Sequence, residues 1–186
     1  MKAIHPSAPS ESLNLWSVPT PWGEFTAAMT SQGALAALAF PADKPKTALG
    51  SARRSASAGH PKAEFHDRSV MPAGTPLRRQ LVEFAKGTRR TFDLPLALGR
   101  RSDFDLAVWR ATEAIRFGQR RSYAELARAI GKSNASQAVG GALGRNPVPL
   151  VIPCHRVVRA DGAIGGFSGG AGWKERLLEF ERRTTG

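Results

Sequence analysis

The chain has 186 residues and an apolar fraction of 41%, which suits a folded protein with one large domain or two small ones. It carries 27 Lys and Arg against 15 Asp and Glu, a formal net charge of +12, and its sequence pI is about 11.2. This surplus favours a polyanionic partner, most simply nucleic acid, although a basic balance can also mean only a soluble surface. No run of about 18 apolar residues is present, so a membrane-spanning helix is excluded.

A single cysteine, Cys154, rules out an intramolecular disulfide. The N-terminal stretch MKAIHPSAPSESLNLW has no apolar core of the length found in signal peptides. Both features predict a cytoplasmic protein. The four histidines are scattered, and no second thiol could complete a zinc-ligand pair, so we expect no metal ion and no cofactor.

Three short apolar runs occupy residues 13–40 and are separated by the turn signals TPWG and SQG. They predict a small antiparallel meander. Residues 41–75 are rich in Pro, Ala, Ser, Lys and Arg, which is typical of a flexible surface loop. Its charges could contact DNA, or the segment could simply be a solvated insert.

A helix is predicted after this segment, with Thr75 as its cap, Pro76 as its first residue and Gly87 as its stop. An extended stretch ending at Leu98 follows. Together these elements predict a small N-terminal αβ domain with an antiparallel sheet, covering residues 1–98.

The spacing of apolar residues becomes helical after Gly99, so we expect a second, mostly helical domain over residues 99–186. A first helix is predicted from about Asp103 to Ile115, and its aromatic stripe is typical of a core. Ser122 and Glu125 form the pattern of a capping box at the start of a second helix.

A third helix is predicted from about Ser133 to Leu143, and the two short helices joined by a short turn make a candidate helix-turn-helix. The exposed side of this third helix would carry Gln137 followed by Gly140 and Gly141, so that a side-chain amide lies next to almost bare backbone. With the basic charge around it, this face could approach phosphates closely. A glycine pair can equally serve tight packing against another helix.

The segment VIPCHRVV raises the question of what Cys154 does. A free thiol has a pKa near 8.5, so a nucleophilic cysteine needs a neighbour that stabilises the thiolate. His155 is adjacent, but consecutive side chains of a strand point to opposite faces, so pairing would require a turn after Pro153 or a bridging water. The alternative is a small buried residue without reactivity.

The C-terminal helix supplies a possible third member of this site. Trp173, Leu177 and Phe180 define its expected buried stripe, and Glu181 falls on the same face. A carboxylate that faces a core must be paired or protonated, and His155 is the natural partner. A relay from Glu181 through His155 and a water to the thiol would then activate it. The alternative places Glu181 in solvent.

The motifs FGQRRSYAELA, QAVGGA, NP, IPCHRVV, GAIGGFSGG and KERLLEFE closely resemble the O6-alkylguanine-DNA alkyltransferases, also called methylated-DNA–protein-cysteine methyltransferases. The similarity is strong over residues 104–181 and looser in the N-terminal half. It implies a ribonuclease H-like N-terminal domain and a winged-helix-like C-terminal DNA-binding domain with a helix-turn-helix. It also implies a monomeric, nucleoid-associated protein. Some members of the family carry structural zinc, but the ligands counted above give no support for zinc in this chain.

The resemblance implies direct reversal of damage in double-stranded DNA bound through its minor groove. The O6-alkylguanine would be flipped out and its alkyl group moved irreversibly onto Cys154, which consumes the protein. Tyr123 would donate to a ring nitrogen of the base, and the Ser168 amide would bind O6. The carbonyls of Cys154 and Val157 would accept from the exocyclic amine, and Asn146 would brace the active-site turn. Further substrate and DNA contacts are implied for Gln137, Ala138, Gly140, Gly141, Arg145 and Phe167.

Two departures from the family pattern stand out. Gln137 occupies the position of an arginine that usually wedges into the base stack, and Phe167 replaces a frequent tyrosine. We expect an active but slower enzyme. The rival hypotheses are a non-catalytic alkylated-DNA sensor of the same fold, a helix-turn-helix regulator and a Cys-His hydrolase.

Overall fold

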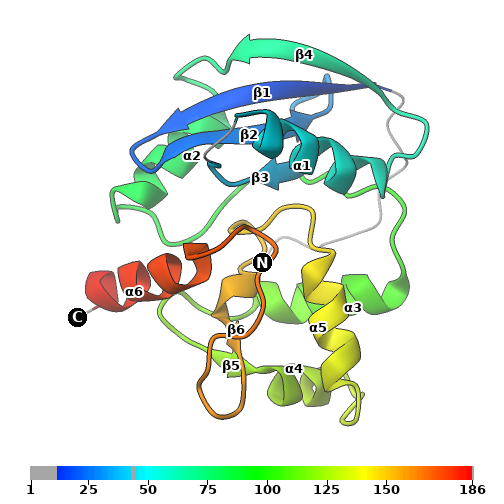
Figure 1. The fold of residues 1–186 in the computed structure, drawn as a ribbon, viewed down its shortest axis with the longest axis vertical. Helices are drawn as coiled ribbons and strands as arrows, with labels where there is room; N and C mark the ends of the chain where they lie inside the picture. Colours follow the sequence, from blue (N-terminus) through cyan, green and yellow to red (C-terminus); the bar gives the residue numbers. More distant parts are fainter. Residues whose placement is uncertain (1–11, 43–44, 186) are drawn as a thin grey trace. The chain divides into compact units, whose positions relative to one another are not determined.

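The computed structural model describes residues 12–42 and 45–185, which form two compact units that divide between Arg101 and Ser102 (Figure 1). The spacing of apolar residues predicted this boundary after Leu98. Two predicted features lie partly outside the described residues. They are the N-terminal stretch without a signal-peptide core, up to residue 11, and the predicted loop, at residues 43–44. No described helix is both long and apolar enough to cross a membrane.

A four-stranded sheet forms the first unit. Strands β1 (Ser12–Thr20), β2 (Gly23–Met29) and β3 (Leu35–Ala39) pair antiparallel, which confirms the predicted meander. Strand β4 (Glu64–Val70) pairs with β1 in parallel, giving the order β3-β2-β1-β4. The sheet is therefore mixed, and the expectation of a wholly antiparallel sheet is wrong.

The segment 41–75 contains regular structure where its composition predicted a loop. Helix α1 (Pro45–Ser57) packs on the sheet through a stripe of small residues, Ala48, Ala52 and Ala56, all buried. The segment is rich in Lys, Arg and Ser, and its apolar positions are alanines and one leucine, so its composition resembles that of a loop although its small residues are spaced as in a helix. The strand β4 is mostly exposed at the sheet edge, so its side chains show no alternation either.

Helix α2 (Pro76–Ala85) begins after Thr75, as predicted, and buries Leu77, Leu81 and Phe84. Its Phe84 ring meets the Trp22 ring edge-on, with centroids 5.7 Å apart. In Figure 1, α1 and α2 lie on the two faces of the sheet. Each face of this small sheet is thus covered by one helix.

The second unit is mostly helical. Its elements are α3 (Asp103–Glu113), β5 (Arg121–Ser122), α4 (Tyr123–Ala129), α5 (Ser136–Gly144), the 3-10 turn η1 (Cys154–Arg156), β6 (Val157–Val158) and α6 (Trp173–Thr185). The predicted capping box is confirmed, because Ser122 accepts from the Glu125 amide and the Glu125 side chain accepts from the Ser122 amide. Trp109 of α3 is fully buried and donates through Nε1 to the carbonyl of Ala142, which fixes α3 against α5.

Candidate active site

A pocket of about 420 Å³ opens in the second unit beside the end of α5. Five of the predicted site residues line it together with three that were not predicted. The lining residues are Tyr123, Gly140, Leu143, Gly144, Cys154, Gly166, Phe167 and Ser168. Three of these positions are glycines, so much of the wall is bare backbone.

The turn between α5 and the cysteine is braced by Asn146, as the resemblance implied. The buried amide Nδ2 donates to the carbonyl of Ile152 at 2.9 Å and to Cys154 Sγ at 3.2 Å, while Oδ1 accepts from the Val148 amide at 3.0 Å. Within this turn Leu150 has a φ of 78°, a strained conformation for a residue with a branched side chain. The side chain of Asn146 holds the turn closed against that strain.

Cys154 begins a 3-10 turn after Pro153, so the chain bends where direct pairing with His155 would require a turn. Within the described residues, however, His155 Nδ1 has no hydrogen-bond partner, so the thiol and the imidazole are not directly paired. The thiol is 4% exposed. Burial raises the pKa of Cys154 to about 11, although the Asn146 hydrogen bond and the positive charge of Lys174 favour the thiolate. At rest the sulfur is therefore protonated and needs a base before it can act as a nucleophile.

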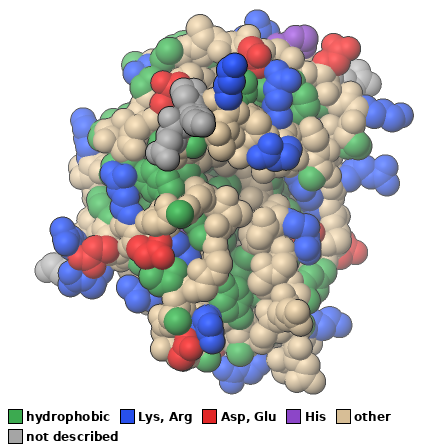
Figure 2. Space-filling model, in the orientation of Figure 1, with side chains coloured by type: hydrophobic (Ala, Val, Ile, Leu, Met, Phe, Trp, Pro, Cys, Tyr) green, Lys and Arg blue, Asp and Glu red, His purple; other side chains and the backbone are tan. Residues whose placement is uncertain are grey.

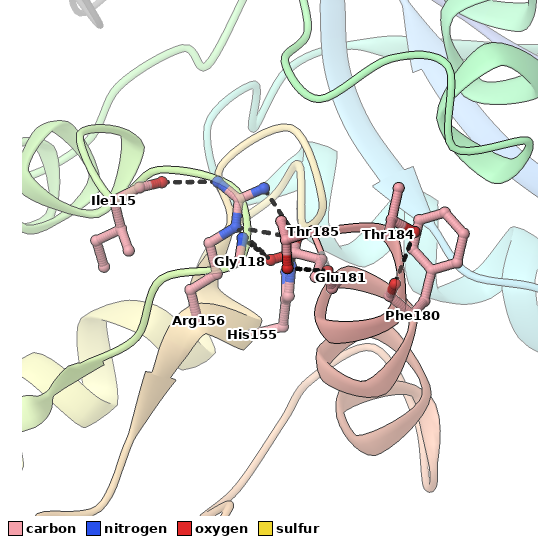
Figure 3. Close-up of polar contacts among 8 residues, drawn as sticks. All are labelled: Ile115, Gly118, His155, Arg156, Phe180, Glu181, Thr184 and Thr185. Atoms are coloured by element: carbon pink, nitrogen blue, oxygen red, sulfur yellow. Dashed lines mark hydrogen bonds and ion pairs between the residues drawn. The ribbon is translucent and has the colours of Figure 1, made fainter.

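The two residues that follow Cys154 in the 3-10 turn belong to a buried ionic cluster centred on Glu181 (Figure 3). His155 Nε2 lies 2.8 Å from Glu181 Oε1, which confirms that these two residues meet. Arg156 donates to the same carboxylate from Nε at 3.0 Å and from Nη2 at 2.9 Å, and from Nη1 to the carbonyl of Ile115 at 2.7 Å. The Gly118 amide donates to Glu181 Oε2 at 2.9 Å.

The charges of this cluster define the tautomer of His155. Burial opposes ionisation of Glu181, but the hydrogen bonds and charges of His155 and Arg156 outweigh it and lower the pKa of Glu181 to about 2. Burial lowers the pKa of His155, against the effect of Glu181. A neutral imidazole that donates from Nε2 to an ionised carboxylate carries its lone pair on Nδ1. That Nδ1 is buried and has no partner among the described residues, so it is available as a base.

Lys174 also lies near the site, although the sequence pattern did not predict it there. Its side chain is 1% exposed, Nζ lies 3.3 Å from the Gly166 carbonyl, and the ammonium lies 5.7 Å from the centre of the Tyr123 ring. Burial lowers the pKa of Lys174, while the charge of Cys154 opposes that change. The expected buried stripe of α6 is therefore shifted: Trp173 and Phe180 are only partly buried, and the buried face consists of Lys174, Leu177, Leu178 and Glu181.

Tyr123 stands at the start of α4 and points into the pocket. A side chain on Gly140 would lie 3.7 Å from its ring, and one on Gly165 would lie 3.0 Å from its hydroxyl. Burial and then the charge of Cys154 raise the pKa of Tyr123, so the phenol holds its proton at neutral pH. Its hydroxyl is therefore a hydrogen-bond donor in the same pocket as the thiol. Val157 is fully buried in β6, where it pairs with Arg121 of β5.

The other predicted contact residues lie outside the pocket, on the exposed side of α5. Gln137, Ala138 and Gly141 are exposed. Arg145 caps α5 and forms a two-point ion pair with Asp105 of α3, at 2.6 Å and 3.2 Å. Asp105 was not predicted, because acidic residues in the first turn of a helix, here Asp103 and Asp105, usually only complement the helix dipole.

The second unit thus defines a class: a small helical protein unit with a buried Cys-His-Glu arrangement opening into a pocket. Residues 103–183 match the family model "6-O-methylguanine DNA methyltransferase, DNA binding domain". The solved Mycobacterium tuberculosis O6-methylguanine methyltransferase has 30% sequence identity and a TM-score of 0.71, over 92% of this chain and 94% of that one. The chain belongs to the O6-methylguanine-DNA methyltransferase family.

Two further relatives extend this comparison. A methylated-DNA–protein-cysteine methyltransferase of Mycolicibacterium paratuberculosis is 46% identical over 104 residues, which are 56% of this chain and 62% of that protein. The matched part thus spans about three fifths of the length of this curated relative. The Mycobacterium tuberculosis protein has also been solved in complex with DNA, at 29% identity and a TM-score of 0.71, over 92% of this chain and 94% of that one.

Proposed function

We propose that this protein repairs DNA by direct reversal, moving the alkyl group of an O6-alkylguanine onto Cys154 in one irreversible turnover. The observation that carries the proposal is the buried thiol at the pocket, backed by a neutral His155 with a free Nδ1 lone pair and an ionised Glu181. The fold and the relatives named above agree with it. The expected substrate is therefore an alkylated base in double-stranded DNA.

In the proposed reaction the thiol proton passes to His155 Nδ1 through a bridging water, while Glu181 and Arg156 hold the imidazolium in place. The Sγ then attacks the alkyl carbon, so that an S–C bond forms as the C–O6 bond breaks. The electron pair of that bond stays with the guanine, whose ring nitrogen accepts a hydrogen bond from the Tyr123 hydroxyl. The guanine then takes up a proton from water, and the imidazolium returns its proton to water. The Ser168 amide would bind O6, and the carbonyls of Cys154 and Val157 would accept from the exocyclic amine. The product is a thioether, which water does not readily hydrolyse.

We further propose that α4 and α5 act as a helix-turn-helix that enters the minor groove, with Gln137, Ala138 and the two glycines of α5 facing the DNA. Extruding a base costs a few kcal/mol of stacking, which the pocket must recover by holding the base. Phe167 offers a ring against that base without a hydroxyl. Arg145, fixed by Asp105, would face a phosphate beside the exposed side of α5.

The proposal includes the finer fold classes that the resemblance implies, a ribonuclease H-like first unit and a winged-helix-like second unit. It includes the division of the chain near residue 98 into an N-terminal αβ domain and a C-terminal DNA-binding domain. It also includes a monomer that works on the chromosome in the cytoplasm, with no metal or cofactor.

The test is the intact-protein mass after incubation with a duplex oligonucleotide that carries one O6-methylguanine, with Cys154→Ser alongside. A gain of one methyl group that stops at one per molecule and is absent in the variant supports suicide transfer. Unchanged mass with retained binding would overturn it in favour of a damage sensor. Repeated turnover on an acyl substrate would point to a hydrolase.

A further inference from the structure

A second hollow lies in the same unit, on the other side of α4 from the active-site pocket. It has a volume of about 230 Å³ and is lined mainly by apolar side chains of α3, of the two residues after α3 and of α4, namely Ala111, Ala114, Ile115, Leu126 and Ala129. At about 100° per residue, Glu125 and Ala129 fall on the side of α4 turned away from Tyr123. This groove therefore does not belong to the alkyl-transfer site.

The rim of the groove is strongly basic. Arg121 lines it directly, and Arg128 lies close enough to the rim residue Glu125 for their charges to interact. Arg116 and Arg120 lie in the connection between two residues that line the groove. All four arginines are exposed, and none of them forms a salt bridge within residues 12–42 and 45–185.

Glu125, the acidic residue among those that line the groove, already serves the end of α4. Glu125 closes the capping box of α4, and its hydrogen bonds to Ser122 lower its pKa. Glu125 therefore stays ionised, but its carboxylate already accepts the hydrogen bond of the Ser122 amide at the start of α4. In contrast, most other arginines of this unit have acidic partners, such as Arg145 with Asp105. Four exposed arginines without salt bridges among the described residues thus lie at or next to this groove.

The size and lining of the groove restrict what could bind there. A volume of about 230 Å³ is below the roughly 300–1,000 Å³ of small-molecule sites, but it can admit one large apolar side chain. The DNA backbone offers charge to such a rim but no isolated apolar group to the hollow. An acidic peptide with one apolar anchor matches both features, since the anchor fills the hollow and carboxylates face the arginines.

We propose that the groove between α3 and α4 docks an acidic peptide segment of a partner protein through a single large apolar side chain. Because it faces away from Tyr123, the partner could bind while the pocket holds a base. The docking does not depend on alkyl transfer, so the two proposals can fail separately.

The probe is a fluorescein-labelled peptide of five aspartates followed by a C-terminal Phe, compared with the same peptide ending in Ala, by fluorescence anisotropy. Loss of the buried ring should weaken binding about tenfold or more. Ala129→Phe places a ring in the groove from an exposed position, so the Phe peptide and the Ala peptide should then bind with equal affinity. Arg121→Gln with Arg128→Gln should weaken both peptides.

The matched control is Arg79→Gln with Lys86→Gln, which removes the same number of exposed charges from the first unit and should leave peptide binding unchanged. Methyl transfer from free O6-methylguanine should proceed at the wild-type rate in every variant, which reports that each one is folded. Equal binding of the two peptides, or Phe-peptide binding that survives Ala129→Phe, would overturn the proposal. If the double arginine variant instead loses affinity for undamaged duplex, with no preference between the peptides, the rim is a DNA surface.

Discussion

At the scale of single residues, the resting state of Cys154 decides how the site works. With its pKa raised to about 11, the sulfur is not a standing nucleophile like that of many reactive cysteines. In the proposed reaction, activation comes from His155 at the moment of transfer and from the few groups that favour the thiolate. Asn146 supplies a side-chain hydrogen bond to the sulfur, at 3.2 Å, and the backbone of Cys154 and His155 also favours the thiolate through hydrogen bonds.

Asn146→Ala should therefore impair both the chemistry and the turn. Its loss leaves the Val148 amide without its acceptor, which we expect to lower the free energy of unfolding by about 1–3 kcal/mol. It also removes a donor to Sγ, so methyl transfer from free O6-methylguanine should slow by on the order of tenfold and its pH profile should move to higher pH. Single-turnover rates between pH 6 and 10, with urea unfolding alongside, check this. An unshifted pH profile would mean that Asn146 only braces the turn.

Glu181 makes the protein sensitive to acid. Its pKa in the folded state is about 2, below the ordinary value of 4.5, so its contribution to stability is fully present above about pH 4.5 and is lost as the pH falls toward 2. Glu181→Gln should lower the free energy of unfolding at pH 7 by roughly 3 kcal/mol. It should also reduce the loss of stability that the wild type shows as the pH falls below about 4.5. Urea unfolding at pH 7, 4 and 3 measures both effects.

Glu179 on the same helix provides the matched control. Its pKa is also lowered to about 2, by hydrogen bonds to Arg182 and Arg183, but these pairs are solvent-accessible and screened. Glu179→Gln should therefore leave the stability at pH 7 nearly unchanged. A loss equal to that of Glu181→Gln would show that helix charge, and not the buried cluster, is responsible.

The pairing of His155 with Glu181 was predictable, because a carboxylate on the apolar face of a helix needs a partner. The role of Arg156 was not, since it follows His155 directly and strand alternation would have put it on the opposite face. A 3-10 turn places both side chains against the same carboxylate. Lys174 was missed for a related reason: hydrophobic patterns assign a lysine to solvent.

At the scale of elements, α5 is unusual for a helix proposed to face DNA. Its sequence SQAVGGALG has no charged residue, and the cation at its C-cap, Arg145, is already paired with Asp105. Close approach is favoured by its glycines and exposed backbone, but insertion into the base stack depends on Gln137 alone. A neutral amide is a weaker stacker than a planar guanidinium.

Gln137→Arg should accelerate methyl transfer from duplex DNA by on the order of tenfold, and leave transfer from the free base unchanged. Gln137 is exposed and does not line the pocket, so the substitution should not disturb the fold. Single-turnover rates with both substrates check this, and Ala138→Ser serves as a neighbouring exposed control. An equal acceleration of both substrates would argue against a role in flipping the base.

Elements with strong local signals were predictable from sequence, whereas those defined by tertiary contacts were not. The α2 helix has a Pro at its start and apolar residues at helical spacing, and α4 has its capping box. Helix α1 depends on alanines that only the sheet makes into a buried face. Strand β4 depends on pairing in parallel with a strand about 50 residues earlier, which no local pattern encodes.

At the scale of the whole molecule, the net charge of +12 should dominate binding to undamaged DNA. Figure 2 shows Lys and Arg side chains spread over the visible face, with acidic ones between them. If four phosphates are neutralised, affinity for a duplex should fall on the order of a hundredfold between 50 and 200 mM salt. Fluorescence anisotropy across this range measures the slope, and transfer from the free base should not change. A flat salt response would mean that the charge serves solubility and not DNA.

A sulfur that stays protonated until an alkylated base enters the pocket also reacts slowly with oxidants and stray electrophiles. Peroxides and soft electrophiles attack thiolates, and susceptibility rises with exposure. The 4% exposure of Cys154 and its raised pKa disfavour both routes. If each molecule repairs one lesion, the repair capacity of a cell equals its stock of unspent protein. Burial of the thiol then determines how long the unreacted protein remains able to repair DNA.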